Sequence, residues 1–148
     1  MRIILQKVTS ANVKVENSII SEIHHGFCLL VGISKDFNEE DIDWAVNKIL
    51  KLKCFSKDAK EWNNSHSILD VQGEILVISQ FTLHARTNKG SKPDFSKAMD
   101  SHNAKKIYEK FVSRLQEKSQ LTIKTGIFGA MMNVEIHNDG PYTLILEK

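Results

Sequence analysis

Two stretches of the chain carry apolar residues on one helical face only, and this pattern constrains the fold more than any other feature. In the first stretch these residues are Ile42, Ala45, Val46, Ile49 and Leu50. In the second, from about residue 101 to 118, they are Ala104, Ile107, Tyr108, Phe111, Val112 and Leu115. A helix with one apolar face must bury that face against another element. The two predicted helices are therefore expected to cover a sheet.

The remaining apolar segments are short and are typical of strands. Residues 27–33 and 75–78 are continuous apolar runs, which indicates strands buried on both faces. The predicted strands cover residues 2–8, 13–15, 19–23, 27–33, 74–83, 121–125, 132–136 and 142–146. This order predicts one α+β domain over residues 1–148, with a mixed or antiparallel, layered or barrel-like sheet covered by the two helices.

Composition excludes several classes of protein. The net charge of +2 argues against a general polyanion binder such as a histone, although a local basic patch stays possible. Cys28 and Cys54 form no CxxC pair and are predicted to be buried reduced thiols, which suits the cytoplasm. The longest apolar run is far below the roughly 20 residues that span a membrane. No histidine lies in a metal-binding motif, so no metal site is expected.

Polar side chains close the predicted strand at residues 74–83. Alternation would place Gln80 and Thr82 on one face and Ser79 and Phe81 on the other. This is either the start of an active site or a strand that runs out into solvent, and the residues alone favour the second interpretation. His84 would share the face of Thr82 as a base beside a nucleophile, but no orienting carboxylate follows, so a solvent-facing histidine is favoured.

Three loops complete the set of candidates. Arg86, Lys89 and Lys92 form a basic loop that could hold phosphates or could simply be solvated. The glycines of residues 126–132 allow close approach of a ligand, or else mark a bulge with Phe and Met in the core. Residues 138–141 predict a tight turn between the last two strands.

Taken together, these segments resemble D-aminoacyl-tRNA deacylases. The resemblance lies in Ser79-Gln80-Phe81-Thr82-Leu83, Gly126-Ile127-Phe128-Gly129-Ala130-Met131-Met132 and Asn138-Asp139-Gly140-Pro141-Tyr142-Thr143. It extends to Gln6-Lys7-Val8 and to Lys89-Gly90-Ser91-Lys92-Pro93-Asp94-Phe95, and so covers essentially the whole chain.

The resemblance implies a homodimeric hydrolase that needs no cofactor and proofreads translation in the cytoplasm, without binding DNA or membranes. It would hydrolyse the ester of D-aminoacyl-tRNA, and of mischarged glycyl-tRNA, to release tRNA. The resemblance makes Ser79, Gln80, Phe81 and Thr82 the candidate catalytic residues, of which the first three match one wall of the family's site. The residues that match the pocket for the terminal adenosine and amino acid are Phe128, Gly129 and Met132. The residues that would contact acceptor-stem phosphates are Arg86, Lys89 and Lys92.

The resemblance also implies a chirality filter. The Gly140-Pro141 peptide is expected to be cis and to reach into the partner subunit's site, where it would exclude an L side chain. Lys7 stands where many members carry arginine, and Tyr142 where valine is frequent. For Thr82 we expect a binding role, with backbone N–H groups near Phe81 holding the ester oxygen and the RNA 2′-hydroxyl assisting.

Two other functions remain as alternatives. One is a related deacylase that clears a small L-amino acid from the wrong tRNA. Phe81 argues against it, because a phenylalanine within Ser79–Leu83 resembles the D-specific branch of the family. The other is a non-catalytic tRNA-binding or synthetase-associated module, against which the near-neutral net charge argues mildly.

Overall fold

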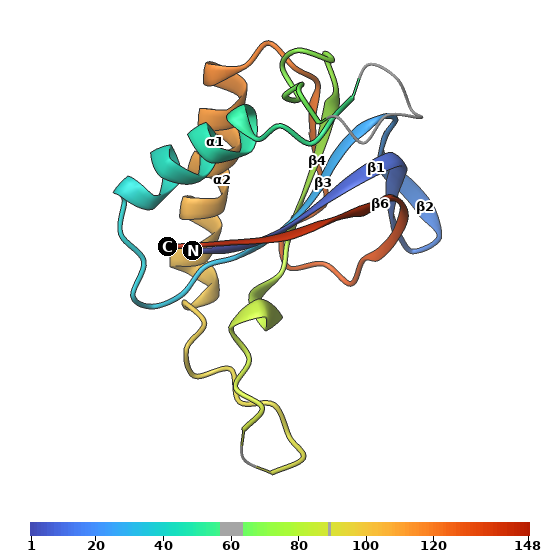
Figure 1. Cartoon of the computed structure of the whole chain (residues 1–148). Helices are drawn as coiled ribbons and strands as arrows, with labels where there is room; N and C mark the ends of the chain where they lie inside the picture. The colour runs from blue at the N-terminus through green and yellow to red at the C-terminus, as the bar shows by residue number, and fades with distance from the viewer. Residues whose placement is uncertain (57–63, 89) are drawn as a thin grey trace.

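One long strand, β1 (Arg2–Val15), is the centre of the sheet (Figure 1). Along one edge it pairs antiparallel with β6 (Asn133–Glu147). Along the other edge its first half pairs with β3 (Gly26–Gly32) and its second half with β2 (Ser18–Ile23), both antiparallel. The computed structural model describes residues 1–56, 64–88 and 90–148.

Parallel strands extend the sheet from β3. Next to it lies β4 (Glu74–Ser79), followed by the short β5 (Ile123–Thr125). Helices α1 (Glu40–Lys51) and α2 (Ser101–Lys118) pack together on one face of the sheet, as Figure 1 shows. The periodicity therefore predicted both helices, and the mixed α+β architecture is confirmed.

The sheet curls until its two ends approach each other. The Ser21 hydroxyl on β2 donates a 2.7 Å hydrogen bond to the carbonyl of Thr125 at the end of β5. This contact joins strands that lie at opposite ends of the strand order, so the sheet is nearly closed. The barrel-like sheet expected from the number of strands is thus confirmed.

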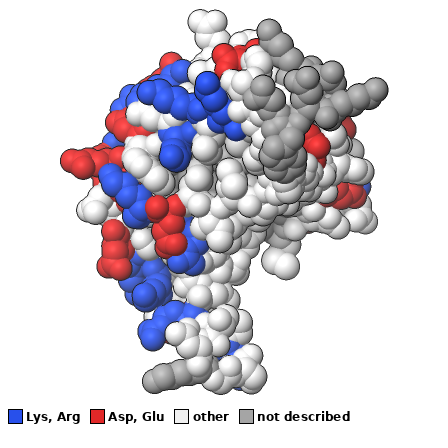
Figure 2. All heavy atoms as spheres, in the orientation of Figure 1, with Lys and Arg blue, Asp and Glu red and all other residues white. Residues whose placement is uncertain are grey.

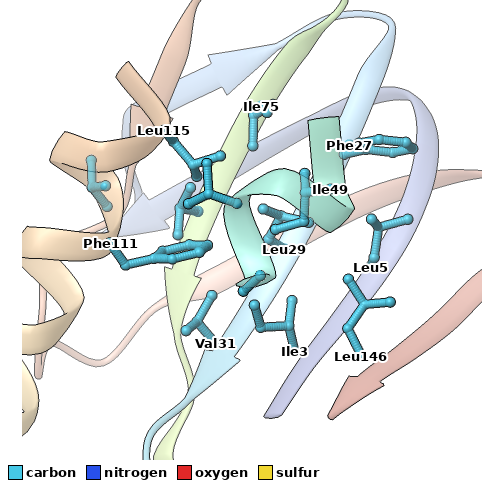
Figure 3. Close-up of a cluster of buried hydrophobic side chains, with 14 of the residues drawn as sticks. Ile3, Leu5, Phe27, Leu29, Val31, Ile49, Ile75, Phe111, Leu115 and Leu146 are labelled. Atoms are coloured by element: carbon cyan, nitrogen blue, oxygen red, sulfur yellow. The ribbon is translucent and has the colours of Figure 1, made fainter. Parts of the chain in front are cut away.

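Both faces of the sheet are covered by apolar side chains. The larger cluster lies between the sheet and the helices, where Ile3, Leu5 and Leu29 meet Phe111 and Leu115 (Figure 3). The smaller cluster lies on the other face, within the curl of the sheet, and consists of Val8, Ala11, Val13, Ile23, Cys28, Leu76 and Ile78. Burial on two faces explains why the sequences of β3 and β4 are continuous apolar runs.

The predicted turn between the last two strands is wrong. Residues 133–147 form the single strand β6, and the predicted strands at 2–8 and 13–15 are likewise one strand, β1. Pairing is interrupted in the middle: Gln6 faces Thr143 and Val8 faces Asn138, so Lys7 alone lies opposite four residues of β6. Residues 139–142 therefore form a bulge on β6, which we call the 139–142 bulge.

Gly26 is required where β3 begins. A Cβ atom at this position would lie 1.8 Å from the carbonyl oxygen of Glu74, a backbone atom that is held in the β3–β4 ladder. At Gly73 the nearest atom would be a side-chain carbon of Ile68 at 3.0 Å, which has more room to move.

We expect Gly26→Ala to lower the free energy of unfolding by about 3 kcal/mol, because the backbone of β3 and β4 must separate to admit the methyl group. Urea unfolding followed by circular dichroism measures this change. Gly73→Ala is the matched control and should cost clearly less. Equal costs for the two variants would contradict the argument from the Glu74 contact.

Candidate active site

The carboxyl ends of the parallel strands meet at one edge of the sheet, and the chain changes conformation there. β4 ends at Ser79, and a 3₁₀ turn, η1 (Phe81–His84), follows Gln80. The predicted strand therefore ends four residues before Leu83, and alternation does not govern which way Phe81 and Thr82 point. Both side chains are exposed, while Ser79 and Gln80 are half-buried.

Thr82 receives a hydrogen bond and faces no base. The Gln80 amide Nε2 donates to the Thr82 hydroxyl oxygen at 2.5 Å. An amide nitrogen cannot accept the hydroxyl proton, so this contact orients Thr82 without activating it as a nucleophile. In the part of the chain that the structure describes, no hydrogen bond joins Thr82 to His84.

The first N–H groups of η1 are available to a ligand. Gln80 donates its backbone N–H to Val31, and the N–H groups of Leu83 and Ala85 bond to carbonyls within the turn. Among the described residues, no backbone carbonyl accepts from the N–H of Phe81 or of Thr82. Unpaired N–H groups at the start of a helical turn can hold a partly negative oxygen.

His84 is buried, so the prediction that it faces solvent is wrong. Its Nε2 atom is buried without a hydrogen-bond partner, and its ring lies beside Gly32, where an added Cβ would be 3.1 Å from the ring. Desolvation lowers the pKa of His84 below its usual value, a hydrogen bond to the Gly32 backbone partly offsets this, and the Arg2 charge lowers the pKa further. The imidazole is therefore a neutral packing group that joins η1 to β3.

Arg2 is a residue that the sequence alone did not single out. Its guanidinium donates to the carbonyl oxygen of Leu83 at 2.6 Å and pairs with the Glu147 carboxylate, also at 2.6 Å. Hydrogen bonds from charged donors are among the stronger ones in proteins. The outer ends of β1 and β6 thus hold η1 in place. The signal in the sequence was the position of Arg2, a charged residue at the start of an otherwise apolar strand.

Phe128 and Met132 lie at the same edge of the sheet. The Phe128 ring packs 5.5 Å from the ring of Tyr108, whose hydroxyl donates to the Val77 carbonyl on β4 at 2.8 Å. Met132 packs so closely on Gly126 that a Cβ there would lie 2.5 Å from its sulfur. The second interpretation of this segment, a core plug, holds for these two side chains.

The rest of this segment is open. Gly129 is exposed and has φ +77°, a conformation that favours glycine. A hollow of about 300 Å³ lies between α2 and residues 125–128; Tyr108, Gln116 and Phe128 line it, and residues 79–82 do not. The structure thus brings Ser79, Gln80, Phe81 and Thr82 to the same edge as Phe128, Gly129 and Met132.

The Gly140-Pro141 peptide lies beside the middle of β1, opposite Lys7. The bond is cis, as the resemblance implies, and both residues are exposed on the 139–142 bulge. η1 contacts Arg2, whereas the bulge faces Lys7, five residues along β1. At a rise of about 3.3 Å per residue this separation is about 16 Å, so a chain does not bring its own bulge to η1.

Lys7 holds the bulge at both ends. Its ammonium forms a 2.9 Å ion pair with Asp139 and lies 5.1 Å from the centre of the Tyr142 ring. The side chain follows Ile3 and Leu5 on the same face of β1 and is buried, with 8% exposure. At the neck of the bulge, the Asn138 side-chain oxygen accepts from Gln6 at 3.2 Å and from Thr143 at 3.4 Å.

Arg86 and Lys92 lie on an extended arm, which we call the 85–99 arm and of which residues 85–88 and 90–99 are described; it leaves the body between η1 and α2 (Figure 1). Arg86 bonds to Asp94 through the backbone and lies 3.8 Å from its carboxylate. Lys92 is exposed, and Lys89 lies outside the described residues. Phe95, exposed on this arm, packs edge-to-face on Phe81 with ring centres 5.1 Å apart.

Neither a metal cluster nor a membrane helix is found where the structure describes the chain. Residues 1–56, 64–88 and 90–148 contain no group of three or more His, Cys, Asp or Glu side chains that could hold a metal ion. No helix within those ranges is long and apolar enough to cross a membrane.

His84 makes stability depend on pH in a definite direction. Because its pKa is lower in the folded chain, the unfolded chain binds the proton more tightly, and acid favours unfolding. The contribution is fully present above about pH 6.5 and is lost as the pH falls toward the folded-state pKa. We expect His84→Gln to reduce the loss of stability between pH 7.5 and 5.0 in urea unfolding. His102→Gln, at an exposed histidine, is the control, and equal pH dependence in all three proteins would contradict the assignment.

Comparison with known proteins identifies the family. A family model described as D-Tyr-tRNA(Tyr) deacylase matches residues 4–147. A D-aminoacyl-tRNA deacylase of Schizosaccharomyces pombe is 46% identical over 148 residues, which is 99% of this chain and 98% of the relative. A D-aminoacyl-tRNA deacylase of Aquifex aeolicus is 44% identical over 147 residues, 99% of this chain and 97% of the relative.

Solved structures agree with the fold. The structure of c-Myc DNA Unwinding Element Binding Protein superposes with a TM-score of 0.93 and 42% identity, covering 100% of this chain and 99% of that chain. A probable eukaryotic D-amino acid tRNA deacylase has a TM-score of 0.84 at 16% identity, which shows the fold alone. With a family model that matches nearly its full length and relatives above 40% identity, the chain belongs to the D-Tyr-tRNA(Tyr) deacylase family.

Proposed function

We propose that this protein is a hydrolase that cleaves the ester of D-aminoacyl-tRNA, and of mischarged glycyl-tRNA, to release the free amino acid and tRNA. The observation that carries the proposal is the match to the deacylase family over residues 4–147. The geometry supports it, since residues 79–82 and 126–132 approach the same edge of the sheet from two strands. No cofactor is part of the proposal.

The proposed chemistry is attack of water on an ester that is already activated. The carbonyl oxygen becomes negative as the tetrahedral intermediate forms, and the unpaired N–H groups of Phe81 and Thr82 would stabilise it. As the intermediate collapses, the bond from the carbonyl carbon to the ribose oxygen breaks. The proton that the water loses passes to this oxygen with the help of the neighbouring RNA 2′-hydroxyl, so no protein base is needed. Thr82, oriented by Gln80, binds the substrate.

The proposal predicts release of tyrosine from D-Tyr-tRNA and of glycine from Gly-tRNA, with L-Tyr-tRNA spared, at catalytic amounts of enzyme. Inactivity on all three esters would contradict an enzymatic function and favour a non-catalytic tRNA-binding or synthetase-associated module. Cleavage of L-Tyr-tRNA would contradict the filter. Cleavage of an L-alanyl ester alone would favour the related deacylase for a small L-amino acid.

A substitution at Thr82 separates binding from nucleophilic catalysis. We expect Thr82→Ala to retain measurable turnover of D-Tyr-tRNA, reduced about 10- to 100-fold, because the N–H groups of η1 remain. Single-turnover deacylation with a parallel tRNA-binding assay measures both effects. A variant that binds tRNA normally and has no turnover at all would show that the hydroxyl is the nucleophile.

The filter is proposed to act between two copies of the chain. Within one subunit the 139–142 bulge and η1 lie about 16 Å apart along β1, so Gly140 and Pro141 would complete the site of a partner subunit in a homodimer. An exposed peptide pressed against the position of an L side chain would reject it sterically, while glycine and D-amino acids pass.

Lys7 is proposed to aim the filter. Removing its ammonium takes away the ion pair to Asp139 and the positive charge beside the Tyr142 ring, which are two of the contacts that hold the bulge. We expect Lys7→Met to lower the ratio of D-Tyr-tRNA to L-Tyr-tRNA kcat/KM about tenfold, mainly by raising L cleavage, which corresponds to about 1.4 kcal/mol of discrimination. Lys14→Met is the control, since Lys14 pairs with Glu135 on the same strands outside the bulge. An unchanged ratio in both variants would exclude this role for Lys7.

The compartment and the nucleic acid are further parts of the proposal. Cys28 and Cys54 are both free and buried, which supports a reducing compartment such as the cytoplasm. Burial raises the pKa of Cys28 to about 12, so this thiol is inert.

RNA, and not DNA, is the proposed partner, and competition by duplex DNA would test this choice. Arg86, Lys89 and Lys92 are proposed to contact acceptor-stem phosphates.

A further inference from the structure

We propose that Lys35 and Lys97 together bind backbone phosphates of the tRNA acceptor end next to the terminal adenosine. The inference rests on the proposed function, since it names where the rest of the substrate lies. Neither lysine lies in one of the segments whose motifs carry the resemblance to the deacylase family. The juxtaposition comes from the fold.

The two lysines lie close together where two turns of the chain meet. Ser34 and Ala98 form an antiparallel bridge, so the next pair outward is Lys35 with Lys97. The Lys35 N–H donates to the Lys97 carbonyl at 3.0 Å, which confirms the register. The backbones of the two lysines are therefore in contact, and both side chains are exposed.

Like charges in this arrangement repel each other. Neither lysine forms an ion pair among residues 1–56, 64–88 and 90–148. Lys35 interacts electrostatically with Asp94. The pKa of Asp94 is lowered mainly by hydrogen bonds from Ser96, and the charges of Arg86 and Lys35 lower it further. Its carboxylate accepts from the Ser96 N–H and hydroxyl at 2.8 Å each and lies 3.8 Å from the Arg86 guanidinium, so Asp94 is shared among several groups.

Exposed ammonium groups that form no ion pair can bind an anion. Two lysines side by side match neighbouring phosphates of one strand, which carries a charge every 3.4 Å or so along a duplex axis. Lysine is a phosphate binder that acts as a point charge, so the contact would not depend on base sequence. Figure 2 shows Lys and Arg atoms, with Asp and Glu atoms among them, at the lower left, where the 85–99 arm leaves the body in Figure 1.

The position of the pair fits the acceptor end. Gly32 packs against both ends of η1: an added Cβ would lie 2.9 Å from the Gln80 carbonyl and 3.1 Å from the His84 ring. Lys35 is three residues further on, so its Cα lies at most about 11 Å from that of Gly32. A substrate with its ester at η1 would therefore carry its next phosphates past Lys35 and Lys97.

The test compares a full tRNA with a substrate that lacks the phosphates. D-tyrosyl-tRNA and the D-tyrosyl ester of adenosine are cleaved by the wild type and by the double variant Lys35→Glu, Lys97→Glu. The control is Lys51→Glu, Lys53→Glu, which makes the same change in net charge at exposed lysines near the end of α1. Thermal unfolding checks that all three proteins are folded.

We expect the Lys35/Lys97 variant to raise KM for D-tyrosyl-tRNA at least about tenfold, to reduce the slope of log affinity against log salt by about 2, and to leave cleavage of the adenosine ester unchanged. The control should match the wild type. Normal KM and salt slope in the Lys35/Lys97 variant, or equal losses on both substrates, would overturn the proposal.

Deacylase activity and phosphate binding by Lys35 and Lys97 can be tested separately. If the wild type cleaves neither ester, the proposed function fails, and fluorescence anisotropy with uncharged tRNA then tests the lysine pair alone, with the same tenfold loss expected. Duplex DNA that competes as well as tRNA, and loses affinity equally in the Lys35/Lys97 variant, would show a general polyanion surface and overturn the assignment to the acceptor end.

Discussion

The pairing of β1 with strands on both of its edges is the interaction on which the rest of the structure depends. Through β3 it fixes the parallel strands whose ends carry η1, and through β6 it fixes the 139–142 bulge. Arg2 extends this control beyond the sheet, because its guanidinium reaches the Leu83 carbonyl. One strand thus sets both the conformation of the candidate catalytic turn and the location of the candidate filter.

Much of the fold follows from local patterns in the sequence. The apolar faces of α1 and α2 and the continuous apolar runs of β3 and β4 predict a two-helix layer over a buried sheet, because burial is what those patterns express. Where prediction fails, a long-range contact overrides the local signal. Asn138-Asp139-Gly140-Pro141 has turn-forming residues, yet pairing of β1 on both sides of Lys7 keeps β6 continuous around it. His84 follows a polar strand end, yet η1 folds it back against Gly32.

The candidate site follows from the resemblance to a family and not from hydrophobic periodicity. Ser79, Gln80 and Thr82 could equally close an ordinary strand, and only their combination with residues 126–132 and 138–143 indicates a family. What no sequence pattern contains is the spatial relation of these segments. The first two share a sheet edge because parallel strands end there, whereas the third lies beside the middle of β1. Arg2, Phe95, Lys35 and Lys97 owe their relevance to such contacts between distant segments.

The 139–142 bulge has a consequence for the edge of the sheet on which it sits. β6 pairs with β1 on one side, and in the described ranges no strand pairs with its other side. A fifteen-residue edge with regular backbone would offer a template for another chain to add to it. The bulge breaks that edge into two short runs, and Pro141 removes one N–H donor from it. The irregularity that presents Gly140 and Pro141 therefore also protects the longest open edge of the molecule from aggregation.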